Sequence, residues 1–114
     1  MDRIIGSSVH VCMDRPLGSA HPRFPDLLYP VNYGFVPGVA APDGDFQDAY
    51  VLGPDIPLRE FSGVVTAILV REDDIETKWI VEDPSAARLG DREIMSLVSF
   101  QERFFKTKII RQDV

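Results

Sequence analysis

Short apolar segments separated by turn residues make up the first half of the chain. Apolar side chains alternate along residues 9–13, and this period of two predicts a strand that runs into the turn-rich stretch 14–19. Prolines within 22–30 remove backbone donors and favour extended neighbours, so we expect 23–33 to be irregular and fixed in place. The same breaks indicate that no helix begins before residue 40.

Further strands are predicted where the apolar runs lengthen. Residues 34–42 continue as strand and loop, and 49–52 form a short apolar strand closed by a Gly-Pro pair. Residues 63–70 and 78–81 are rich in β-branched and aromatic side chains, and the acidic stretch 71–76 separates them. This pattern predicts a hairpin with a charged tip.

The spacing of apolar residues becomes helical near the C-terminus. Asp91 is suited to an N-cap and Glu93 to the dipole of a first turn. The apolar positions that follow are Ile94, Leu97, Val98 and Phe105. We expect one helix over about 91–105. Several short strands with one terminal helix predict a mainly β (α+β) fold, a small barrel that the helix closes or plugs.

Length and charge narrow the class of protein. A chain of 114 residues forms one domain, 1–114, with a single core. It carries 12 Lys and Arg against 18 Asp and Glu, a formal charge of −6, which disfavours nucleic acid and anionic membrane as partners. No apolar run approaches the roughly 20 residues that cross a bilayer, and the start lacks a signal peptide, so we expect a cytoplasmic protein.

An acidic turn is the strongest chemical signal in the sequence. Asp43, Asp45 and Asp48 lie close together in the sequence. Gly44 allows a tight turn in which the side chains of Asp43 and Asp45 can approach one another. Mg²⁺ prefers oxygen ligands and keeps several waters, so a few convergent carboxylates suffice when substrate phosphates supply the rest. A solvated acidic turn is the alternative on spacing alone. A calcium EF-hand is excluded, because its twelfth position would be Pro54 instead of Glu.

A second acidic group precedes the last predicted strand of the hairpin. Glu72, Asp73, Asp74 and Glu76 lie in the turn before Lys78. Alone, such a group is typical of a charged hairpin tip that favours solubility. Together with the first turn it matches metal-assisted phosphoryl transfer, which needs metals to neutralise phosphate oxygens and activate water, and fixed cations for the remaining charge.

Two motifs in this order resemble a known family. The stretch 29–38, which reads Y-P-V-N-Y-G-F-V-P-G, is followed by the D-G-D-x-x-D turn at 43–48. Together they resemble the soluble (family I) inorganic pyrophosphatases. The resemblance implies an OB-like five-stranded barrel with one helix. It also implies Mg²⁺-dependent hydrolysis of pyrophosphate to two phosphates.

The resemblance further implies a role for individual residues. Tyr33 and Lys78 would contact phosphate at the reacting centre, and Tyr29 would line or support the phosphate site. Asp45 would bind metal and help to deprotonate the attacking water, because metal-bound water has a lowered pKa and a carboxylate can accept its proton. The implied metal ligands are Asp43, Asp45, Asp48, Glu76 and either Asp73 or Glu72.

The chain departs from the family pattern at its phosphate contacts. Family members usually carry an early Glu and Lys on the first hairpin and a later Arg. Arg15 and Arg23 are the available replacements, with His21 a third, and Arg15 is favoured because neighbouring Pro and Gly residues fix its turn. In the terminal helix, Phe104 and Phe105 occupy the places of a family Tyr and Lys.

These departures leave two functional hypotheses. The intact acidic turn favours a pyrophosphatase. Arg103 and Lys106 are the candidates to replace the missing helix contacts, and basic residues that only complement the C-terminal end of a core helix are the favoured alternative. The altered phosphate contacts favour instead a weakened homologue, a regulatory module that binds phosphate or a nucleotide. A purely structural barrel would leave the carboxylates of the first turn unexplained. The edge of so small a barrel also predicts a homo-oligomer.

Overall fold

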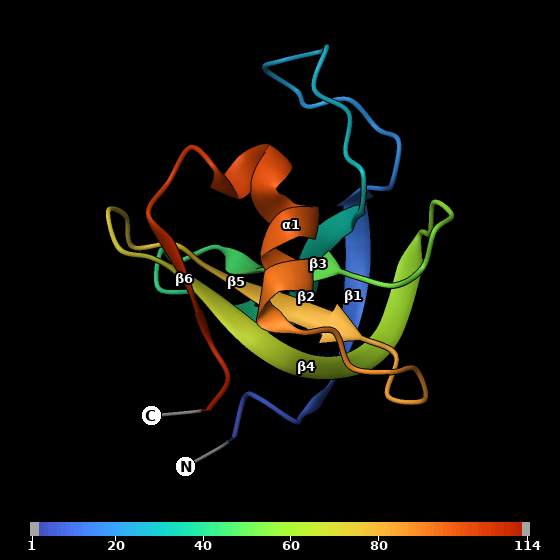
Figure 1. The fold of residues 1–114 in the computed structure, drawn as a ribbon, viewed down its shortest axis with the longest axis vertical. Coiled ribbons are helices and arrows are strands. Elements are labelled where there is room, and N and C mark those ends of the chain that lie inside the picture. The colour runs from blue at the N-terminus through green and yellow to red at the C-terminus, as the bar shows by residue number, and fades with distance from the viewer. Residues whose placement is uncertain (1–2, 113–114) are drawn as a thin grey trace.

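A closed barrel of short strands with one helix across its side forms the molecule (Figure 1). The computed structural model describes residues 3–112. In chain order, its elements are β1 (Ser8–Arg15), β2 (Asn32–Ala40), β3 (Phe46–Val51), β4 (Glu60–Arg71), β5 (Thr77–Glu82), α1 (Asp91–Glu102) and β6 (Thr107–Ile110).

The strands pair in the order β1-β2-β3-β5-β4, and β1 also pairs with β4, which closes the sheet into a five-stranded barrel. β3 and β5 run parallel, whereas the other neighbours are antiparallel. The β4–β5 pairing confirms the predicted hairpin with its charged tip. The expected mainly β (α+β) fold, a small OB-like five-stranded barrel with one C-terminal helix, is therefore confirmed. The short strand β6, which the sequence pattern did not predict, adds to β4.

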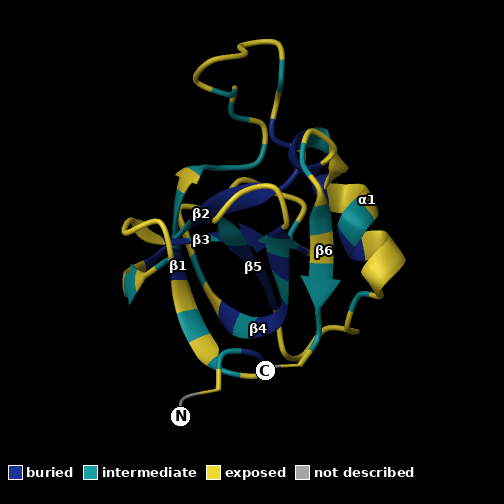
Figure 2. Ribbon diagram, turned by 90° about the vertical axis from the view of Figure 1, so that its left-hand side faces the viewer, coloured by how far each residue is buried: buried dark blue, intermediate teal, exposed yellow. Residues whose placement is uncertain are grey.

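Apolar side chains on both faces of β3 and β5 hold the barrel and the helix together. Tyr50 and Ile80 belong to a cluster that includes Ile94 and Val98 of α1. Their neighbours along the two strands belong to a second cluster with Val11, which is fully buried. Strands buried on both faces read as continuous apolar runs, as residues 49–52 and 79–81 do in the sequence. Figure 2 shows the same segments buried.

Loop 16–31 projects from one end of the barrel (Figure 1) and is fixed by buried Asn32. The side-chain Oδ1 of Asn32 accepts hydrogen bonds from the backbone N–H groups of Leu17 and Leu58, and its Nδ2 donates to the carbonyl of Ile56. The loop also contains a bridge between Ala20 and Leu28. The sequence prediction of an irregular, fixed segment is thus confirmed, except that strand β2 begins at its last two residues.

The helix begins at Asp91, as predicted, but its N-cap residue and its C-terminal end differ from the prediction. Gly90, not Asp91, is the N-cap, and its N–H donates to Glu93 Oε1 at 3.1 Å. The helix ends at Glu102 and not at 105, because the chain then turns to form β6, which pairs with β4; the Glu102 side chain bonds to Arg71 of β4. Within residues 3–112, no helix is long and apolar enough to span a membrane.

Candidate active site

An open pocket of about 890 Å³ lies between the barrel, loop 16–31 and the turn that follows α1. Both basic and acidic side chains line it, together with aromatic rings. The lining residues are Asp14, Arg15, His21, Phe24, Asp26, Leu27, Tyr33, Asp48, Arg71, Glu76, Lys78, Gln101, Arg103, Phe104 and Phe105.

Lys78 is the charged centre of the pocket. Parallel pairing of β3 with β5 places it directly beside Asp48. Its Nζ donates to Asp48 Oδ2 at 2.7 Å and to the Tyr33 hydroxyl at 2.8 Å, and lies 3.0 Å from Glu76 Oε2. The Lys78 side chain is buried, whereas those of Asp48 and Glu76 are 33% and 30% exposed, so a ligand in the pocket can reach both carboxylates.

The environment of Lys78 keeps its ammonium charged. Burial alone would lower the pKa of Lys78, but Tyr33 and Asp48 outweigh burial and raise it above its ordinary value. Burial raises the pKa of Tyr33, so its phenol stays neutral at physiological pH. The pair can therefore present a permanent positive charge and a neutral hydroxyl to an anionic ligand.

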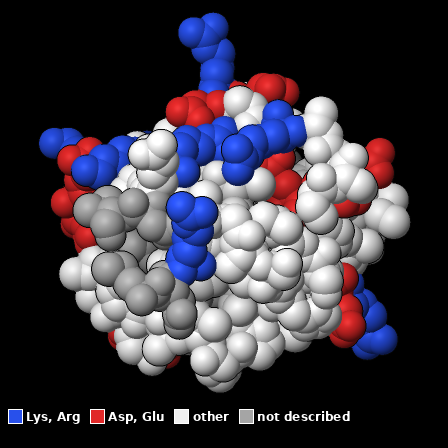
Figure 3. All heavy atoms as spheres, turned by 90° about the horizontal axis from the view of Figure 1, so that it is seen from below, with Lys and Arg blue, Asp and Glu red and all other residues white. Residues whose placement is uncertain are grey.

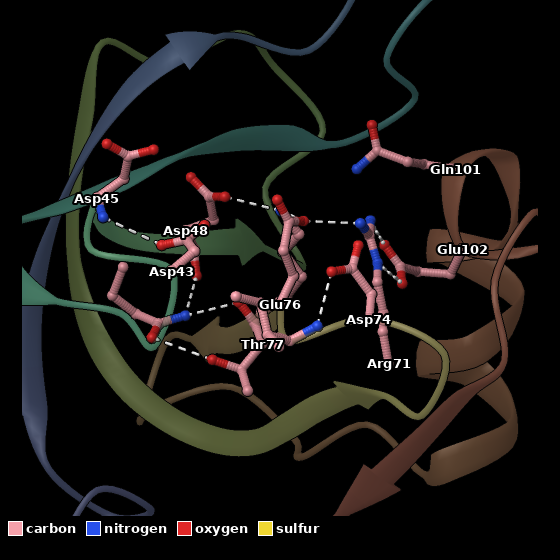
Figure 4. Close-up of polar contacts among 12 residues, drawn as sticks. Asp43, Asp45, Asp48, Arg71, Asp74, Glu76, Thr77, Gln101 and Glu102 are labelled. Atoms are coloured by element: carbon pink, nitrogen blue, oxygen red, sulfur yellow. Dashed lines mark hydrogen bonds and ion pairs between the residues drawn. The ribbon is translucent and has the colours of Figure 1, made fainter.

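Arg71 and Glu102 form a buried ion pair behind this centre, and sequence reasoning missed both residues. Arg71 donates from Nε and Nη2 to the two oxygens of Glu102, at 3.0 and 2.8 Å, and from Nη1 to Glu76 Oε2 at 2.7 Å. Its guanidinium lies 3.7 Å from the ring centroid of Phe105. Glu102 also accepts from the hydroxyls of Tyr50 and Thr107. Figure 4 shows Asp48, Glu76, Arg71 and Glu102 in a row from the barrel to the helix.

A sequence signal for this pair did exist. Arg71 ends the apolar run of β4, and Glu102 falls four positions after Val98 on the buried face of α1. A charged residue at a position that the period assigns to the core is normally paired. The partners lie far apart in sequence, however, so the pattern alone does not indicate that they meet.

Acid should weaken the contribution of Glu102 to stability. Burial alone would raise the pKa of Glu102, but hydrogen bonds from Arg71 and Tyr50 outweigh burial and lower it. A group whose folded pKa is lowered stabilises the fold above its unfolded pKa, and this contribution is lost as the pH falls through the folded value. Urea denaturation between pH 7 and pH 3 should therefore show a shallower loss of stability in Glu102→Leu than in the parent. Equal slopes would contradict this assignment.

Arg15 reaches the pocket from the end of β1, where it pairs with Tyr33 of β2. Its Nη1 donates to the Tyr29 hydroxyl at 2.6 Å, and that hydroxyl donates to Gln101 Oε1 at 3.0 Å. Tyr29 is fully buried and does not line the pocket. Its place beneath Arg15 makes it a support for that guanidinium.

The structure brings some of the sequence-predicted site residues together and leaves others apart. Arg15, Tyr33, Asp48, Glu76 and Lys78 all line the pocket. Asp43, Asp45, Asp73, Arg23 and Tyr29 do not.

The residues left apart have local partners. Asp43 Oδ1 accepts from the Asp45 N–H at 3.1 Å in the exposed turn before β3 (Figure 4). Asp73 Oδ1 accepts from the N–H of Lys106 at 3.2 Å. The N–H of Arg23 donates to His21 Nδ1 at 3.1 Å. The proposed ligand or substrate roles of these side chains stay predictions.

Asp14 and Arg103 also line the pocket without having been predicted as primary site residues. Burial raises the pKa of Asp14, and this effect outweighs the opposing effect of Arg15. Arg103 lies at the C-cap of α1, one of the two basic positions considered for the missing helix contacts. The other, Lys106, does not line the pocket.

Asp48 and Glu76 are the two carboxylates of the pocket that could ligate a divalent metal ion together. No group of three Asp, Glu, His or Cys side chains within residues 3–112 is placed to hold a metal ion by itself. Asp48 and Glu76 nevertheless converge on the same ammonium group and are partly exposed. Mg²⁺ is commonly bound by one or two carboxylates with the rest of its shell from water and substrate phosphates. These two side chains meet that requirement.

Comparison with solved structures defines the class of fold. The sequence matches no protein-family model and no curated protein. The structure resembles that of an inorganic pyrophosphatase from Ehrlichia chaffeensis with a TM-score of 0.69 and 19% identity, over 91% of this chain and 85% of that chain.

Two further pyrophosphatases give the same result. The Helicobacter pylori protein has a TM-score of 0.63 and 19% identity, over 97% of this chain and 87% of its own. The Thermus thermophilus protein has a TM-score of 0.60 and 23% identity, over 92% of this chain and 82% of its own. The fold is therefore that of the inorganic pyrophosphatases. At these identities the likeness establishes the fold alone.

Proposed function

We propose that this protein hydrolyses inorganic pyrophosphate to two phosphates in a Mg²⁺-dependent reaction. The observation that carries the proposal is the cluster of Lys78, Asp48, Glu76 and Tyr33 in an open pocket. A fixed ammonium, a neutral hydroxyl and two reachable carboxylates are the groups that metal-assisted phosphoryl transfer requires. The fold shared with pyrophosphatases supports the same reaction.

Positioning and charge neutralisation are the main tasks of the protein in this reaction. Lys78 and Arg15 bind phosphate oxygens, and the Tyr33 hydroxyl donates to a third once Lys78 has turned to the substrate. Asp48 and Glu76 would hold Mg²⁺, which when bound would lower the pKa of a coordinated water toward neutrality. Tyr29 keeps Arg15 aimed into the pocket through its hydrogen bond.

The acidic turn before β3 completes the proposal. Asp45 would accept the proton of the attacking water, and Asp43 and Asp73 would be further oxygen ligands if the two acidic turns move toward the pocket when the ligand binds. Catalytic contacts are often long in a ligand-free structure and tighten only in the complex, so the exposed position of Asp45 is compatible with this role. Arg23 then serves as an outer phosphate contact from loop 16–31.

Asp45→Asn should lower kcat for pyrophosphate by about 100-fold or more, because a positioned general base contributes about 10²–10⁴ in rate. The exchange keeps the size of the side chain and, at an exposed position, should leave the fold unchanged. Steady-state phosphate release is the measurement, with Asp55→Asn as the matched control. Asp55 is an exposed aspartate outside the pocket. A rate within twofold of the parent would remove Asp45 from the mechanism.

A second candidate function is a regulatory module that binds phosphate or a nucleotide without turnover. The observation in its favour is that Lys78 and Arg71 already neutralise the carboxylates of Asp48 and Glu76. Titration calorimetry distinguishes the two functions. Binding of pyrophosphate without release of phosphate favours the module, whereas turnover favours the enzyme.

The localisation, partners and oligomeric state of the protein are also proposals. We expect a cytoplasmic homo-oligomer without nucleic acid or membrane partners. Figure 3 shows a broad area without charged side chains on one face, bordered by a row of Lys and Arg. Depletion of charge is typical of the centre of subunit interfaces. Light scattering coupled to gel filtration should give a multiple of the monomer mass, and a monomer at micromolar concentration would contradict the proposal.

A further inference from the structure

The pocket is larger and more aromatic than pyrophosphate alone requires. Its volume of about 890 Å³ falls in the range of about 300–1,000 Å³ that holds ligands the size of a drug or cofactor. Its floor carries the charged groups around Lys78. Its outer walls come from loop 16–31 and from the turn after α1, and both walls carry phenylalanine.

Each wall presents an aromatic ring to solvent. Phe24 of the loop is 61% exposed and Phe104 of the turn is 65% exposed, although both line the pocket. Single exposed apolar residues are ordinary on a protein surface. Two exposed rings from separate segments around one charged pocket form an arrangement that suits a planar ligand.

Contacts with neighbouring side chains hold the loop around Phe24 in place. His21 lies 5.2 Å from Phe24 and stacks on buried Tyr29 at 6.2 Å, measured between ring centroids. The backbone N–H groups of Arg23 and Phe24 both donate to His21 Nδ1, at 3.1 and 3.3 Å. The imidazole therefore fixes the loop around Phe24.

The opposite wall combines a ring with a cation. The guanidinium of Arg103 lies 5.0 Å from the ring centroid of Phe104. Among residues 3–112, neither Arg103 nor Arg15 has a carboxylate within ion-pair distance, unlike Lys78 and Arg71. Two positive charges at the pocket are thus available to an anionic ligand.

We propose that the pocket takes a nucleoside diphosphate, with the base against Phe104 and Phe24 and the phosphates at Arg15, Arg103 and Lys78. This inference rests on the proposed function, because it assumes that the charged floor binds a phosphoanhydride. Beyond the proposed function, the inference adds that the ligand carries a nucleoside next to its phosphates. In the hydrolytic reaction, water oxygen bonds to the terminal phosphorus and water loses a proton to a base or to solvent. The bridging P–O bond breaks with its electron pair on the oxygen of the leaving nucleoside monophosphate, and phosphate is the other product.

The test compares two ligands that differ only in the nucleoside. Methylenediphosphonate and α,β-methylene-ADP contain a P–C–P bridge that water does not cleave, so binding is measured without turnover. Titration calorimetry with Mg²⁺ should show α,β-methylene-ADP binding at least about fivefold more tightly, since stacking of one base on an aromatic side chain is worth about fivefold or more in affinity. Equal affinities would overturn the inference.

Variants locate the effect on the aromatic walls. Phe104→Ala should remove about fivefold or more of the affinity for α,β-methylene-ADP and leave that for methylenediphosphonate within about twofold. Phe46→Ala is the matched control, because Phe46 is 55% exposed but lies outside the pocket. Equal weakening of both ligands by Phe104→Ala would contradict a role in base binding, as would no weakening of either.

The outcome is separable from that of the proposed function. Release of phosphate from pyrophosphate with equal binding of the two analogues would leave the pyrophosphatase standing and overturn the nucleotide inference. Selective binding of α,β-methylene-ADP without hydrolysis of pyrophosphate would support the nucleotide inference and overturn the pyrophosphatase.

Discussion

Lys78→Met is expected to lower kcat for pyrophosphate by about 10²–10³, which is the usual effect of removing one preorganised charge-stabilising donor. The ammonium of Lys78 is buried, stays charged because its pKa is raised, and belongs to the lining of the pocket. Steady-state phosphate release at saturating Mg²⁺ is the measurement. Lys108→Met, which changes an exposed lysine of β6, is the matched control.

Loss of Lys78 also leaves two carboxylates facing one another, so folding has to be checked separately. Asp48→Asn removes one of these charges while its amide oxygen can still accept from Lys78 Nζ. A comparable fall in kcat for Asp48→Asn, with an unchanged thermal midpoint, would attribute the effect to chemistry. Activity near the parent level in both folded variants would contradict the placement of the site.

Glu102→Leu is expected to lower the free energy of unfolding by about 3–5 kcal/mol, because it leaves the guanidinium of Arg71 buried with only Glu76 as an ionic partner. Urea denaturation at pH 7 measures the change. Glu72→Leu, at an exposed position of the charged turn, should change stability by less than about 0.5 kcal/mol.

The double variant Arg71→Met with Glu102→Leu tests the physical reason for that loss. Removing both charges eliminates the unpaired ion, and replacement of a buried ion pair by apolar side chains is often neutral. The double variant should therefore be more stable than the sum of the two single changes predicts. Strict additivity would show that the two side chains stabilise the fold independently.

Periodicity predicted most of the barrel because the barrel depends on local alternation. The strands β3, β4 and β5 follow runs of apolar side chains, and the glycine, proline and acidic residues between them mark the turns. The end of α1 and the strand β6 were missed for a common reason. Beyond Glu102 the chain turns away to pair with β4, and Glu102 itself contacts Arg71; both are contacts between distant segments that have no periodic signature.

The site was predicted in part for similar reasons. Asp48 and Lys78 pair directly across neighbouring strands, and Glu76 lies in the turn just before β5, so acidic turns in the sequence indicated the right region. Arg71, Arg103 and the exposed phenylalanines enter the pocket from segments whose approach depends on the tertiary structure. Carboxylates of the two exposed turns were predicted to converge as metal ligands, which stays a prediction, because their approach depends on tertiary structure and not on local pattern.

Phosphate release from pyrophosphate by the purified protein, with Mg²⁺ and in parallel with Asp48→Asn, tests the central claim most directly. The account predicts release that depends on Mg²⁺ and falls by about 10²-fold or more in the variant, which excludes a contaminating enzyme. Folded protein that binds pyrophosphate but releases no phosphate, or release that is equal in the variant, would contradict it.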